Sequence, residues 1–144
     1  MQAASKASGG LLVLTAILGL VIIGFDNVLR TGAPAHYYAL MGFVVLDFAV
    51  AIFIVARPTR AAFSIAIGWC LLRIILQIAD ISQASVYQFS SYAQFADYLF
   101  NPASGLAVGL GNPPGVPGAL IDLILALEIA VFAVAWKGRP VAGT

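Results

Sequence analysis

Four long apolar stretches constrain this chain more than any other feature. An α-helix needs about 20 residues to cross a hydrocarbon layer about 30 Å thick. Backbone groups in lipid must be paired internally, and the chain lacks the alternation of membrane β-strands, so helices are the only option. The sequence therefore predicts an all-α integral membrane protein, a single domain with four transmembrane helices. The predicted spans are residues 9–29, 36–56, 61–81 and 118–136.

The composition supports a membrane environment. Of the 144 residues, 62% are hydrophobic and 9% are charged, whereas a soluble domain carries about 25% charged residues. A soluble chain of this size leaves much of its surface in water and has too little interior for so many apolar side chains. Membrane lipids are therefore the expected surroundings. The net charge of +1 gives no indication of nucleic-acid binding.

An alternative for the first stretch is a cleaved signal peptide. Lys6 would supply its positive end, and residues 33–35 (Ala-Pro-Ala) would supply a small-residue cleavage site. Asp26 and Arg30 lie between the apolar run and that site, where a signal peptide would not carry them. Their position favours a retained helix.

Basic residues predict the orientation. Five of them flank the predicted spans on one side of the membrane: Lys6, Arg57, Arg60, Lys137 and Arg139. Only Arg30 lies beyond the spans on the opposite side. By the positive-inside rule, both termini are predicted to be cytoplasmic. We expect a multi-pass protein in the cell membrane of a prokaryote.

The long outer connection, residues 82–117, is predicted to contain a short amphipathic helix. Ser91 and Gln94 have the spacing of a capping box, and aromatic residues then recur at helical intervals. We expect this helix to lie on the outer surface with its aromatic side against lipid or a partner. The residues expected to bind that partner are Tyr92, Phe95, Tyr98 and Phe100.

Ionisable residues inside the spans are the strongest functional candidates, because a charge in mid-membrane costs about 2.5–3.5 kcal/mol and needs protein contact. At about 1.5 Å per residue, Arg73 and Asp122 lie about 20 and 22 Å from the inner boundary. The sequence predicts an ion pair between them that locks the third span to the fourth. Gln77 and Asp80 extend the face of Arg73 as a polar stripe. That stripe would face the fourth span or a partner, or line a proton path.

Asp47 and Glu128 form a second level, about 15 and 14 Å from the inner boundary. No basic residue of the chain lies at this depth. If the two carboxylates face each other, both cannot remain charged, which would suit proton carriage. If they face apart, each needs a donor elsewhere, such as on another chain.

The fourth span also carries a row of small residues. Ala126, Ala130 and Ala133 share one face with Asp122, whereas Glu128 lies about 200° around the helix from Ala126. Small residues at this spacing let helices approach closely. A lone bundle readily covers one such face, so two protein-seeking faces favour contact with another subunit.

The chain lacks the residue sets of common metal and catalytic sites. Cys70 and His36 are each the only residue of their type, which excludes a zinc or bis-histidine haem site built within one chain. No hydrolase, metalloprotease, phosphate-binding or dinucleotide motif is present. No cofactor is expected, although bound lipid or quinone is compatible with the outer aromatic residues.

The leading hypothesis is a non-catalytic accessory or structural subunit of a larger membrane complex, such as a respiratory or other redox assembly. Its partners would be other integral membrane subunits. The alternative is a small oligomeric transporter or proton-conducting protein that uses Asp47 and Glu128. An enzyme acting on lipid or quinone is least favoured, because no nucleophile–base pair can be identified.

Overall fold

The structure is a computed structural model, and it describes residues 1–25, 34–88 and 116–140. These ranges are helical apart from short turns and ends. Their helices are α1 (Gln2–Phe25), α3 (Pro34–Ala56), α4 (Arg60–Gln88) and α7 (Val116–Gly138). Three segments are long and apolar enough to cross a membrane: Gln2–Gly24, Tyr37–Ala56 and Arg60–Ala79. The prediction of an all-helical membrane bundle is confirmed to that extent.

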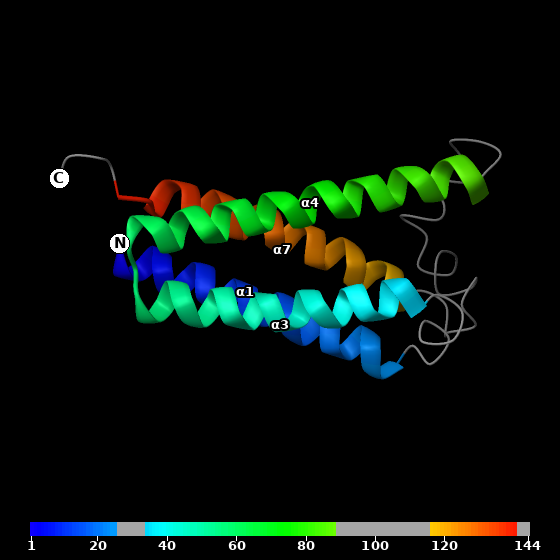
Figure 1. Cartoon of the computed structure of the whole chain (residues 1–144), viewed down its shortest axis with the longest axis horizontal. Coiled ribbons are helices and arrows are strands. Elements are labelled where there is room, and N and C mark those ends of the chain that lie inside the picture. Colours follow the sequence, from blue (N-terminus) through cyan, green and yellow to red (C-terminus); the bar gives the residue numbers. More distant parts are fainter. Residues whose placement is uncertain (26–33, 89–115, 141–144) are drawn as a thin grey trace.

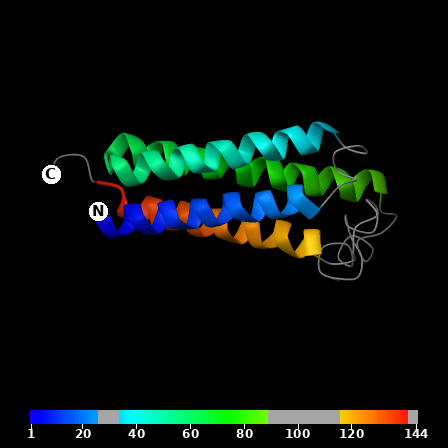
Figure 2. The ribbon, with the colours of Figure 1, turned by 90° about the horizontal axis from the view of Figure 1, so that it is seen from below.

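The helices lie side by side along one long axis (Figure 1). Around the bundle they follow the order α1, α3, α4, α7, and each packs against the two beside it. Figure 2 shows α1 and α7 on one side of the bundle and α3 and α4 on the other. Neighbouring helices run in opposite directions. The beginning of α1, the α3–α4 turn and the end of α7 therefore meet at one end of the bundle.

A tight turn joins α3 to α4. Pro58 lacks the N–H that would continue a helix, and the backbone N–H of Arg57, the residue after α3, still bonds back to the carbonyl oxygen of Phe53. Thr59 then caps the next helix, because its Oγ1 accepts a hydrogen bond of 3.2 Å from the N–H of Ala62. The local sequence thus both ends α3 and starts α4.

The larger of the two apolar clusters formed by the described residues lies in the half of the bundle nearest this turn. Leu12, Ile54, Phe63 and Val131, one from each helix, are fully buried there. The close packing of α1 on α3 depends on Gly9, where a Cβ atom would clash with the Val55 side chain and lie 3.3 Å from the backbone oxygen of Ala51.

The outside of the bundle is apolar. Val45 and Ile52 on α3 are 65% and 67% exposed, and Ile75 and Ile78 on α4 are 55% and 54% exposed. In contrast, several charged and hydroxyl side chains are buried between the helices. This arrangement suits a lipid surrounding, in which exposed apolar side chains carry no penalty and polar groups must find protein partners.

The sequence predictions for residues 82–117 are only partly covered by the structure. Helix α4 continues to Gln88, past residue 81, where its membrane span was expected to end. The expected amphipathic helix lies outside the described residues, and so do its four partner-binding candidates, Tyr92, Phe95, Tyr98 and Phe100. That helix and the orientation of the termini stay predictions.

Candidate functional site

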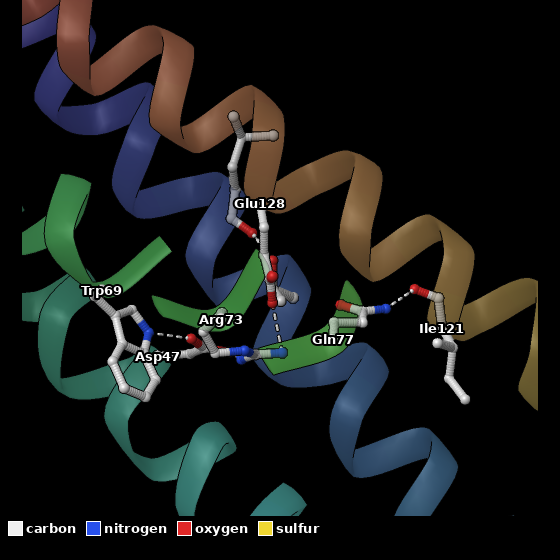
Figure 3. A network of polar contacts seen from close by, with 8 residues as sticks. Asp47, Trp69, Arg73, Gln77, Ile121 and Glu128 are labelled. Carbon is white, nitrogen blue, oxygen red and sulfur yellow. Dashed lines mark hydrogen bonds and ion pairs between the residues drawn. The ribbon is translucent and has the colours of Figure 1, made fainter. Parts of the chain in front are cut away.

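A buried arginine lies between two buried carboxylates in the interior of the bundle (Figure 3). Nη1 of Arg73 donates a hydrogen bond of 2.5 Å to Oδ2 of Asp47, and Nη2 lies 2.5 Å from Oε1 of Glu128. The three residues are only 6%, 1% and 1% exposed, respectively. One guanidinium on α4 therefore binds α3 and α7 together.

The direction of the side chains explains why these residues meet. In an α-helix the Cα–Cβ bond tilts toward the helix N-terminus. Helix α4 runs opposite to α3 and α7, so Arg73 leans toward the α3–α4 turn while Asp47 and Glu128 lean away from it. The backbone of Arg73 lies about 5 Å farther from the inner boundary than the backbones of Asp47 and Glu128. The opposite tilts of the side chains bring their charged groups to the same depth.

Aromatic side chains enclose the Asp47–Arg73 pair. Nε1 of Trp69 donates a hydrogen bond of 2.7 Å to Oδ1 of Asp47. The ring of Phe43 lies against the guanidinium of Arg73, with its centroid 4.7 Å from Cζ, and packs edge-on against Trp69. Both Asp47 oxygens thus accept charge-assisted or indole hydrogen bonds, which stabilise its negative charge.

Glu128 has a poorer set of partners. Its Oε1 lies close to Nη2 of Arg73, but this ion pair lacks the alignment of a hydrogen bond. Neither carboxylate oxygen of Glu128 accepts a hydrogen bond from the described residues, although both are buried. The two carboxylates around Arg73 are therefore not equivalent.

A second polar contact joins α4 to α7. Nε2 of Gln77 donates a hydrogen bond of 2.8 Å to the backbone oxygen of Ile121 (Figure 3). Arg73 and Gln77, the first two members of the expected polar stripe, thus both face α7. The side chain of Asp80 lies outside the described residues.

The structure differs from the sequence prediction in the partner of Arg73. Arg73 pairs with Asp47 and Glu128, and Asp122 makes no ion pair with it or with any other described residue. On a helix Asp122 lies about 120° around from Glu128, so both cannot point at one guanidinium. The alternative in which Asp47 and Glu128 face apart and need donors on another chain does not hold, because Arg73 reaches both.

The two faces of α7 have different surroundings. Beside Glu128, the inward face carries Ile124, Val131 and Ala135, which are at most 3% exposed. On the opposite side lies what we call the outer face of α7, which consists of Asp122, Ala126, Ala130 and Ala133. Ala126 and Ala133 are exposed, and Asp122 and Ala130 are half-buried. This face has small side chains and one carboxylate.

Sequence reasoning missed the roles of two aromatic residues. The sequence predictions assign no role to Trp69 or Phe43. Each lies four residues before a member of the charge network, Trp69 before Arg73 and Phe43 before Asp47. Residues at this spacing share a helix face, so a search one turn away from each intramembrane charge could have identified them.

The described residues contain no group of three or more His, Cys, Asp or Glu side chains that could hold a metal ion. No family model matches the chain, and neither a curated protein nor a solved structure matches it. What the network and the outer face of α7 do must be argued from their own chemistry.

Proposed function

We propose that this chain is a non-catalytic structural subunit of a larger membrane complex, and that it contacts its partner through the outer face of α7. The observation that carries the proposal is the exposure of this face, with Asp122 half-buried beside Ala126 and Ala133. A carboxylate within the hydrocarbon layer needs protein contact. The small residues beside it let a second helix approach closely enough to provide that contact.

The proposal takes α7 as a fourth transmembrane helix. It has 23 residues, lies between α1 and α4 in the bundle, and carries Glu128 to the level of Arg73. With four spans, the five basic residues that flank them lie at one end of the bundle. Both termini are then cytoplasmic by the positive-inside rule, and the location is a cell membrane.

The proposed partner is another integral membrane subunit. Its facing helix would carry small residues at the contact and a hydrogen-bond donor or a basic group opposite Asp122. The interior network needs no group from the partner subunit, because Arg73 already binds both Asp47 and Glu128 within the chain. The aromatic residues of the 82–117 connection remain a second proposed contact.

Site-specific crosslinking in native membranes tests the proposal. A photoreactive residue at Ala126 or Ala133 should form an adduct with a different integral membrane protein. Ala49, an exposed small residue on α3, is the matched control and should give no such adduct. Equal labelling from position 49, no adduct at all, or adducts only with a second copy of the chain would contradict the proposal.

A second candidate is a small oligomeric transporter or proton-conducting protein. The observation that favours it is the burial of two carboxylates, Asp47 and Glu128, around one guanidinium in the middle of the bundle. Liposomes containing the purified chain should then show proton or substrate flux that Asp47→Asn and Glu128→Gln variants lose. An absence of flux in oligomeric protein would rule this candidate out.

A further inference from the structure

The charges of the buried network do not balance. One guanidinium, that of Arg73, faces two carboxylates, those of Asp47 and Glu128. With both carboxylates ionised, the network would hold one uncompensated negative charge in the interior of a lipid-embedded bundle. Uncompensated charge is the least stable state for a group in such surroundings, which is why buried groups pair or become neutral.

Among the residues that the structure describes, no other charged side chain of the packed helices lies where it could supply the balance. Helix α1 carries one charged residue, Lys6, which is exposed near the helix start. On α7, the charged residue nearest to Glu128 is Asp122. Its side chain would add negative charge, and it lies on the outer face of the helix. The Cys70 thiol, buried one turn from Arg73 on α4, brings no positive charge either.

The geometry distinguishes the two carboxylates. Asp47 receives a hydrogen bond on each oxygen, from Trp69 and from Arg73, and these donors stabilise its ionised form. Glu128 is 1% exposed, and both of its oxygens lack a hydrogen-bond donor among the described residues. A proton on Glu128 removes its charge and turns one oxygen into a donor.

We infer that the network is a proton-binding site that holds one exchangeable proton on Glu128, with Asp47 ionised and paired to Arg73. In this state the three side chains are neutral as a group. Release of the proton to water leaves one negative charge between α4 and α7. This inference does not depend on the proposed partner of α7, because the site lies on the inward face of that helix.

Infrared difference spectroscopy of the purified full chain in lipid tests the inference. The probe is the C=O stretching band of a protonated carboxylic acid, recorded at neutral pH against alkaline pH. The measurement is best made in an Asp122→Asn background, which removes the half-buried carboxyl of the outer face. A band sensitive to deuterium exchange should be present, and Glu128→Gln should abolish it. Asp47→Asn should abolish it too, because Glu128 then ionises to balance the charge of Arg73.

A second variant covers the case in which Glu128→Gln does not fold. Glu128→Asp keeps a carboxyl at this position and should shift the band instead of removing it. The inference is overturned if the Asp122→Asn protein shows no such band, if the band survives Glu128→Gln, or if Glu128→Asp leaves the position of the band unchanged. Crosslinking at Ala126 reports separately on the proposed partner, so the two proposals can fail independently.

Discussion

Arg73 and Glu128 come within 2.5 Å of each other from antiparallel helices, in the part of the bundle where Asp47 reaches the same guanidinium from a third helix. Of the neighbouring pairs, α3 and α4 are in the least extensive contact. The Asp47–Arg73 and Asp47–Trp69 hydrogen bonds lie in that seam. The two hydrogen bonds of Asp47 therefore join the pair of neighbouring helices that is in the least extensive contact.

Removing the guanidinium should strongly destabilise the bundle. Arg73→Met leaves the ionised Asp47 buried without its cation, and breaking a buried ion pair in this way costs about 3–5 kcal/mol. Adding Asp47→Asn and Glu128→Gln to the same chain should recover much of that loss. Unfolding of the purified protein in mixed micelles, followed by circular dichroism, measures both effects.

The matched control for this rescue is Asp122→Asn in the Arg73→Met background. Because Asp122 makes no ion pair with Arg73, this change should restore little stability. Rescue by Asp122→Asn together with no rescue by the Asp47 and Glu128 changes would mean that Arg73 pairs as the sequence first suggested.

The indole of Trp69 should contribute to stability through its hydrogen bond and not only through packing. Trp69→Phe leaves Oδ1 of Asp47 without its donor, and hydrogen bonds to charged groups contribute about 1.5–3 kcal/mol. Trp136→Phe is the control, since Trp136 is 53% exposed and its change should be within about 0.5 kcal/mol. Equal effects of the two variants in the same unfolding assay would contradict a specific role for Trp69.

The helical fold could be predicted because its cause is local. Three segments of the chain are apolar runs long enough to cross a membrane, and Pro58 with Thr59 marks the α3–α4 turn in the sequence itself. Helix geometry also predicts that α7 has two different faces, because Glu128 and Ala126 lie on opposite sides of one helix. The structure buries Glu128 and exposes Ala126.

Depth along the backbone alone does not predict the partner of Arg73. By that measure Arg73 and Asp122 lie at one level, and Asp47 and Glu128 at another. The count leaves out the length of an arginine side chain and the tilt of side chains toward the helix N-terminus, which brings groups on antiparallel helices together. The face of α7 that turns inward also depends on how α7 packs against α1. The sequence of α7 alone does not specify that packing.

The stability of the bundle should fall as pH rises if Glu128 holds a proton in the folded state. An unfolded glutamate is ionised above about pH 5, so over neutral pH the folded chain binds one more proton than the unfolded chain. Linkage then gives a loss of about 1.4 kcal/mol per pH unit until Glu128 itself ionises. Unfolding free energies measured across this range should show the slope in the wild type and lose it in Glu128→Gln. Equal slopes for the two proteins would contradict the assignment.

The α1–α3 contact should be sensitive to one glycine and not to its neighbour. Gly9 faces α3, where a new side chain would meet Val55 and the backbone oxygen of Ala51, whereas nothing lies within 4 Å of a Cβ at Gly10. Gly9→Val should therefore destabilise the bundle by about 1–3 kcal/mol, the usual cost of overpacking. Gly10→Val changes the helix propensity in the same way but meets open space, so the difference between the two variants isolates the contact. If both variants unfold at the same point in the micelle assay, α1 does not pack on α3 through this face.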